Sequence, residues 1–232
     1  MKSRTIIQIV LGVAIIALCV LLYNSIQKPM RFDNEYTKRR DACAEKLKSI
    51  RALEDAYKLT YGKYCGSFDT LFSRLMNEDS MKVISKVINY DQIPADVDIN
   101  EVPELEAVKK GYISRKEILV NPIEKLREDG KLPIKDANGY VHQLTDEEIL
   151  NLRYIPYPKG EKNQFELEAG MIEKSGLLVP VFECKAPLTT LLSDMDHQLV
   201  VNKIAEINEV KGRYAGWKVG DMTQAVTDGN FE

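Results

Sequence analysis

The sequence predicts an α+β protein with an N-terminal transmembrane helix, an amphipathic helix, and then a soluble domain with a small antiparallel sheet and a second long helix. Three observations carry this prediction: an uncharged apolar run over residues 6–26, a helical apolar period over 34–61, and alternating apolar and polar residues between 152 and 184. The 232 residues suffice for one domain with appendages, because domains hold about 100–200 residues. The expected parts are a cytoplasmic tail (1–5), a signal anchor (6–26), a linker (27–33) and one soluble domain (34–232).

The charge of the chain is divided between a basic start and an acidic body. Residues 1–40 hold seven Lys or Arg and two Asp or Glu, a net charge of +5, whereas the remainder has a net charge of −8. An acidic body with one Trp and no basic run longer than residues 38–40 argues against a nucleic-acid binder. Two histidines, His142 and His197, and four scattered cysteines argue against a Cys/His zinc site.

The apolar run at residues 6–26 predicts a membrane-attached protein. About 20 apolar residues, at about 1.5 Å each, cross a hydrocarbon layer of about 30 Å. A cleaved signal peptide would need small residues after Leu22, and a lipoprotein would need a small residue in place of Leu18 before Cys19. We therefore expect an uncleaved anchor that contacts the lipid bilayer through residues 6–26.

The orientation of this anchor follows from two opposing signals. Lys2 and Arg4 favour a cytoplasmic N-terminus, although more cations lie between residues 28 and 40 on the other side. A short tail is normally retained while a large domain is translocated. We therefore expect a single-pass protein of the bacterial inner membrane with a periplasmic C-terminal domain.

Two long helices and several strands are predicted for the soluble part. Pro29 predicts a helix break, Asn34 caps a new amphipathic helix, and Gly62 ends it. The charged interruptions in its apolar stripe argue against a leucine zipper, so we expect it to pack on its own domain. The other predicted elements are a short helix capped by Ser67 or Asp69, a helical turn at Glu104–Lys110, a hairpin turn at Asn138-Gly139, a capping box at Thr145–Glu148, strands at Arg153–Tyr157, Gln164–Ala169, Leu177–Glu183 and Gly216–Gly220, and a second long helix from Leu188 to about Val210.

Two groups of polar residues have partial metal-site spacing. The first, Asp136, Asn138, Tyr140 and Glu147, follows part of an EF-hand, but its glycine stands at the fourth loop position instead of the sixth. A plain hairpin turn explains it better. In the second group, Asp194, Asp196 and His197, the two carboxylates diverge by about 200° on a helix and do not converge on one metal. We therefore expect no metal ligand and no cofactor.

No catalytic motif is evident in the sequence. A Gly-x-Ser-x-Gly elbow and a phosphate-binding glycine loop are both missing, which favours a non-enzymatic protein. A Ser–Lys pair stays open, because its members would meet only in the fold. An anchored hydrolase is the alternative, and it would need a deep pocket that gathers His142 or His197 with acids and a serine.

The soluble cysteines leave a disulfide open. Cys43 lies about 27 Å along a straight helix from Tyr61, whereas a disulfide needs Cα atoms within roughly 7 Å. In an oxidising compartment Cys65 and Cys184 are therefore the favoured pair. Three free thiols are the alternative.

The first third of the chain carries a family resemblance at Ala52–Tyr57, Tyr61–Tyr64, Phe68 and Leu71. At these residues it resembles type IV pilins and the pseudopilins of secretion systems. In these proteins the apolar segment and the following helix form one long helix, and a glutamate follows a peptidase-cut glycine at the fifth position of the hydrophobic run. Here no acid occurs between Val13 and Leu22 after Gly12, and Pro29 predicts an interruption.

A second resemblance is to single-pass envelope proteins of Bacteroidota. It is carried by Ile50–Phe72, Leu152–Tyr157 and the end of the chain at Gly229–Glu232. It implies a location in the cell envelope and brings no activity with it. We expect a non-enzymatic, membrane-anchored protein that acts through contacts with partner proteins, as a secretion or envelope-assembly subunit, with a pseudopilin-like subunit as the alternative.

Overall fold

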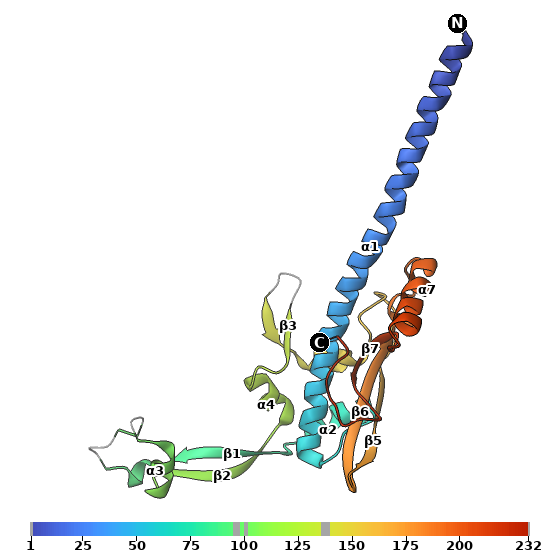
Figure 1. Cartoon of the computed structure of the whole chain (residues 1–232). Coiled ribbons are helices and arrows are strands. Elements are labelled where there is room, and N and C mark those ends of the chain that lie inside the picture. Colours follow the sequence, from blue (N-terminus) through green and yellow to red (C-terminus); the bar gives the residue numbers. More distant parts are fainter. Residues whose placement is uncertain (1, 95–97, 100–101, 136–139, 232) are drawn as a thin grey trace.

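The computed structural model describes residues 2–94, 98–99, 102–135 and 140–231. One long helix, α1, extends far beyond the rest of the chain, and the other elements gather around its C-terminal half (Figure 1). A two-stranded arm projects sideways from the end of this body that lies farthest from the N-terminus (Figure 1). Mixed helices and small antiparallel sheets confirm the α+β class.

The helices and strands of the described residues have the following bounds. The helices are α1 (Lys2–Tyr61), α2 (Phe68–Asn77), α3 (Glu104–Lys109), α4 (Pro122–Glu128), α5 (Asp146–Leu150), α6 (Leu188–Leu191) and α7 (His197–Ala205), with short 3₁₀ turns at Tyr90–Gln92 and Asn151–Arg153 and a π-helical turn at Glu206–Val210. The strands are β1 (Met81–Ile88), β2 (Ile113–Val120), β3 (Pro133–Lys135), β4 (Val141–Gln143), β5 (Glu166–Lys174), β6 (Leu177–Pro187) and β7 (Gly216–Gly220).

Helix α1 is continuous, so the helix break predicted at Pro29 is wrong. Pro29 lies inside the helix. An interior proline removes one hydrogen bond and costs about 3 kcal/mol or more, but helix is already formed on both sides, so nothing has to be nucleated again. Phe32, one turn later, is buried and belongs to the main hydrophobic core. The packed body therefore holds the helix on the C-terminal side of the proline.

A three-stranded antiparallel sheet, in the order β5-β6-β7, packs beside the C-terminal half of α1 (Figure 1). Leu47 and Ile50 from the helix and Phe182 and Val219 from the sheet all belong to one buried core. Gly220 has φ of +76°, and a Cβ there would lie 2.2 Å from the carbonyl oxygen of Phe182. The predicted strand at Gly216–Gly220 is therefore confirmed, and its last position requires glycine.

Helices α2 and α4 contact α1, and β3 and α5 lie across a cavity from it. Gly62, with φ of +73°, ends α1 as expected, and its N–H donates to the Lys58 carbonyl at 2.8 Å. The Thr145–Glu148 capping box is confirmed at the start of α5. The predicted Asn138-Gly139 turn lies outside the described residues, although β3 and β4 on either side of it pair as antiparallel strands.

Two sequence predictions for the C-terminal half are wrong. The second long helix is broken into α6, α7 and the π-helical turn, because Leu192 leaves the helical conformation and the Asp196 side chain caps α7 as a new helix. The strand predicted at Arg153–Tyr157 is reduced to an isolated bridge between Tyr154 and Gln164. The local apolar pattern predicts a regular element in both places. In the first a new helix begins at the Asp196 cap, and in the second only one bridge forms.

Candidate interaction surface: the two halves of helix α1

The N-terminal half of α1 exposes its apolar side chains on all sides. The large apolar residues between Ile7 and Ile26 each leave 53–66% of their surface exposed. By length and composition the helix is a candidate membrane span, and its most apolar stretch is not buried against the rest of the chain. A contiguous exposed apolar surface such as the one between Ile7 and Ile26 marks a site of contact with a membrane or with another protein.

The C-terminal half of α1 buries its apolar side chains against the body. Cys43, Leu47, Ile50 and Leu53 are completely buried. They follow one another at steps of three or four residues, so they form a single stripe along the helix. This confirms the prediction that the amphipathic part packs on its own domain.

Arg39 fixes the segment between α6 and α7 to α1. Its side chain is 7% exposed; one guanidinium nitrogen donates to the Leu191 carbonyl at 2.9 Å, and two donate to the Asp194 carboxylate. The guanidinium also lies 4.9 Å from the centre of the Tyr157 ring. The bond with Arg39 lowers the pKa of Asp194, so this carboxylate stays ionised and paired with the guanidinium.

Glu54 is a fully buried acid in the middle of the domain. Its Oε2 accepts the backbone N–H of Cys65 at 2.8 Å, while Oε1 has no hydrogen-bond partner among the described residues. Burial raises the pKa of Glu54 to about 8, although the hydrogen bond from Cys65 opposes this rise. The carboxyl is therefore largely protonated at neutral pH and ties α1 to the loop before α2.

Sequence reasoning missed both Arg39 and Glu54. In the sequence, Glu54 is one of the charged interruptions of the apolar stripe, and Arg39 is part of the basic run at residues 38–40. Both lie three or four residues from stripe positions, Arg39 before Cys43 and Glu54 after Ile50. That spacing is the signal that a polar side chain faces the core.

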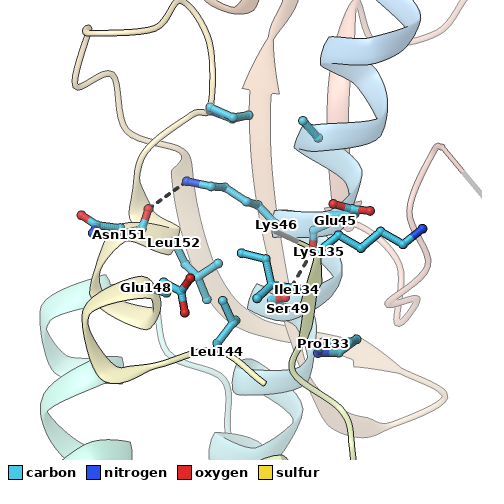
Figure 2. A pocket seen from close by; sticks show the side chains of 12 residues that line it. Glu45, Lys46, Ser49, Pro133, Ile134, Lys135, Leu144, Glu148, Asn151 and Leu152 are labelled. Carbon is cyan, nitrogen blue, oxygen red and sulfur yellow. Dashed lines mark hydrogen bonds between the residues drawn. The ribbon is translucent and has the colours of Figure 1, made fainter. Parts of the chain in front are cut away.

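A cavity of about 290 Å³ lies between α1 and the β3–α5 region (Figure 2). Its polar side chains include Glu45, Lys46, Ser49 and Glu148. It thus brings a serine and a lysine together, one turn apart on α1. This is the arrangement that the sequence left open as a Ser–Lys pair.

Lys46 and Ser49 of this cavity are engaged in structural hydrogen bonds. The Lys46 ammonium donates to the Asn151 carbonyl at 3.0 Å, and Ser49 donates to the Glu45 carbonyl at 3.3 Å (Figure 2). The Lys46 ammonium also donates to the Tyr154 carbonyl at 2.8 Å. Burial lowers the pKa of Lys46. A serine activated by a lysine needs a hydrogen bond between the two, and among the described residues these two side chains bond elsewhere. Lys46 therefore joins α1 to the turn after α5.

The histidines required for the hydrolase alternative lie elsewhere. His142 approaches Glu148, with Nε2 3.4 Å from Oε1 in an exposed position, and His197 begins α7. Neither is among the described residues that line the cavity at Ser49. Within the described ranges, neither histidine therefore joins Ser49 in this cavity.

The two metal-site candidates do not assemble in the described part of the chain. Asp136 and Asn138 lie outside the described residues, Tyr140 is 75% exposed, and Glu147 belongs to the first turn of α5. Asp196 caps α7 by accepting backbone N–H groups. Across the described residues, no group of three or more His, Cys, Asp or Glu side chains is placed to hold a metal ion.

The cysteines are free thiols in the structure. Cys43, Cys65 and Cys184 are buried, and Cys19 is exposed on the apolar half of α1. The favoured Cys65–Cys184 disulfide is therefore not formed, and the free-thiol alternative holds. Burial raises the pKa of Cys43 to about 12 and that of Cys184 well above its usual value, so both thiols stay protonated and unreactive.

Comparisons of the chain with protein-family models, curated proteins and solved structures found no match. The class that the fold and this surface define is an α+β protein with one long, half-exposed helix. Its function is therefore inferred from the residues and the geometry described above.

Proposed function

We propose that the protein is a non-enzymatic, membrane-anchored envelope protein that acts through protein–protein contacts as a pseudopilin-like assembly subunit. One observation carries this proposal: α1 is a single helix whose apolar half is exposed on all sides and whose other half packs on a three-stranded antiparallel sheet. This combination of one long helix and a packed antiparallel sheet is the arrangement that favours pilin ancestry over an unrelated anchored domain.

The exposed half of α1 supports the membrane part of the proposal. A helix that is apolar all round is stable where its surroundings are apolar all round. A bilayer supplies such surroundings, and so do the apolar helices of neighbouring subunits. We place the helix in the bacterial inner membrane, with the body on the periplasmic side.

The continuity of α1 through Pro29 supports the pseudopilin-like part. The sequence suggested that the proline would separate the anchor from the domain, and such a separation would leave the domain free to swing. A continuous helix instead couples the apolar half rigidly to the body. Because no acid follows Gly12 within the apolar run, helices of adjacent copies would pack through apolar contacts without a buried charge pair.

An envelope protein that uses its anchor only for attachment, and binds other partners through its body, is the second candidate. The projecting β1–β2 arm favours it, because Ile84 and Leu119 on this arm are 67% and 59% exposed. The two candidates differ in whether copies of the chain contact each other through α1.

Cysteine crosslinking in native membranes tests the proposal. Cys19 is replaced by serine, and single cysteines are introduced in turn at residues 14–21 before oxidation with copper phenanthroline. We expect disulfide-linked dimers at positions that repeat every three or four residues, because packed helices contact each other on one face. The Cys19→Ser chain without an added cysteine is the control, since its other cysteines are buried.

Three results would contradict the proposal. Equal crosslinking at every position would indicate random collision, and no crosslinking at any position would favour the anchor-only candidate. Release of the chain from membranes by alkaline carbonate would exclude the membrane anchor itself.

A further inference from the structure

A hollow of about 260 Å³ lies between α1 and α7 at the junction of the two halves of α1. It is lined by Lys28, Arg31, Phe32, Met195, Asp196 and Leu199. Helix α7 runs beside α1 on the side of the body that faces the apolar half (Figure 1). Residues far apart in the sequence thus form one site next to the candidate membrane span.

The cations of this hollow stand just past the end of the apolar run. At about 1.5 Å per residue, Lys28 lies about 3 Å and Arg31 about 8 Å beyond Ile26 along the helix. The head-group layer of a bilayer is about 5–8 Å deep on each side of the hydrocarbon. If the apolar half spans the membrane as proposed, both cations lie at the level of the lipid phosphates.

These two cations have no partner in the part of the chain that the structure describes. Lys28 and Arg31 make no hydrogen bond or ion pair with any described residue, whereas Lys38 and Arg40, further along α1, pair with Glu35 and Asp41. The acid in the lining, Asp196, is occupied at Oδ1, which accepts the backbone N–H groups of Gln198 at 3.1 Å and Leu199 at 3.2 Å. The lining therefore carries a net charge of +1.

The inner wall of the hollow is apolar. Phe32 is 7% exposed, and Met195 and Leu199 pack against the same core. An apolar wall excludes water from one side of the cations, and charge pairs are stronger where water is excluded. The wall also fits the carbon skeleton of a head group.

We propose that this hollow binds the phosphodiester group of an anionic membrane lipid. The phosphate oxygens pair with Lys28 and Arg31, and the carbon atoms beyond the phosphate lie against Phe32 and Leu199. The net charge of +1 matches a head group whose only charge is that of the phosphodiester. It matches a zwitterionic head group less well, because the amine of that head group cancels the phosphate charge. This inference rests on the proposed membrane anchor, and it adds that the junction recognises a lipid of one charge class.

Lipid retention by the full chain tests this inference. The protein is reconstituted into nanodiscs of phosphatidylcholine with either phosphatidylglycerol or phosphatidylethanolamine added, and native mass spectrometry counts the lipids that stay bound on release. We expect the wild-type chain to retain phosphatidylglycerol. The Lys28→Gln/Arg31→Gln variant should lose this preference about tenfold, since each cation near an anionic surface contributes severalfold.

Two variants separate the hollow from general basic attraction. Lys38→Gln/Arg40→Gln removes the same charge further along α1 and should keep the preference. Met195→Glu leaves both cations in place but puts an acid in the wall, and should reduce the retention of phosphatidylglycerol. Unchanged fluorescence of Trp217 would verify that each variant is folded.

The outcomes that would overturn the inference are distinct from failure of the anchor. Equal losses in both double variants, or equal retention of phosphatidylethanolamine, would contradict a site for anionic lipid. A chain that does not stay in the nanodiscs at all would contradict the proposed membrane anchor.

Discussion

The two halves of α1 carry similar apolar residues in opposite surroundings. Ile15 in the N-terminal half is 53% exposed, whereas Leu53 in the C-terminal half is completely buried. The difference lies in the arrangement around the helix, since one half is apolar on every face and the other along one stripe. A stripe is satisfied by one packed neighbour, but an all-round apolar surface needs an apolar environment.

The polar residues of the two halves sharpen this comparison. No charged residue lies between Ile7 and Ile26. In contrast, Arg39 and Glu54 lie almost fully buried on the packed side of the other half, where Arg39 is bonded to the distant Leu191 and Glu54 to Cys65 just past the end of α1. Buried polar groups are tolerated where hydrogen-bonding partners are supplied, and only the body supplies them.

The largest effect on the free energy of unfolding is expected at the buried position Leu53, in contrast to the exposed position Ile15. Leu53→Ala should lower the free energy of unfolding of the body by about 2–5 kcal/mol, because it removes buried methyl groups and leaves a cavity. Ile15→Ala should change it by less than about 0.5 kcal/mol. Urea unfolding of the full chain in detergent micelles, followed by the fluorescence of the single Trp, Trp217, measures both. Equal losses would show that the two halves form one packed unit.

The next effect concerns the buried acid. The pKa of Glu54 is about 8 in the folded protein and 4.5 as the ordinary value, so the folded state binds an extra proton between these limits. The contribution of Glu54 to the free energy of unfolding should therefore be largest below about pH 4.5. It should fall as the pH rises to about 8, by at most about 1.4 kcal/mol per pH unit.

Glu54→Gln should remove this pH dependence, because the amide oxygen still accepts the Cys65 N–H and carries no titrating proton. The variant should then exceed the wild type in stability at pH 9 and match it at pH 5 in the same urea assay. Glu45→Gln, at an exposed position of the same helix, is the matched control and should keep the wild-type slope. A wild-type slope in Glu54→Gln would show that another group titrates.

A smaller loss is expected from the clamp between α1 and the α6–α7 segment. Arg39→Ala should destabilise the body by about 1–3 kcal/mol, because the buried Leu191 carbonyl loses its donor and Asp194 loses its partner. Arg40→Ala, which removes an exposed pair with Asp41, should cost less than about 1 kcal/mol. A double-mutant cycle with Asp194→Ala measures the coupling, and a coupling of zero would contradict the clamp.

The smallest effect on the body is expected at the junction. Pro29→Ala restores one backbone hydrogen bond in an exposed part of α1 and should slow amide hydrogen exchange over residues 26–33. The free energy of unfolding of the body should change by less than about 0.5 kcal/mol, since Pro29 lies outside the core. A loss as large as that of Leu53→Ala would place the junction within the packed unit.

Local signals in the sequence predicted several elements well. The end of α1 at Gly62, the capping box at Thr145–Glu148 and the strand Gly216–Gly220 are confirmed because each depends on residues that are neighbours in the chain. The β1–β2 arm was not predicted. Its two strands show no regular alternation of apolar and polar residues, and more than twenty residues separate them in the chain.

The sequence by itself determined that α1 has one half apolar on every face and one half with a single apolar stripe, because side-chain periodicity is a property of neighbouring residues. Only the tertiary structure decided that the helix continues through Pro29, that the helix predicted after Leu188 breaks into α6 and α7, and that Arg39, Glu54 and Lys46 face inward. These outcomes depend on partners such as Asp194, Cys65 and Asn151, which reach α1 only when distant segments pack together. A lost backbone bond or a buried charge is tolerated when such contacts offset its cost.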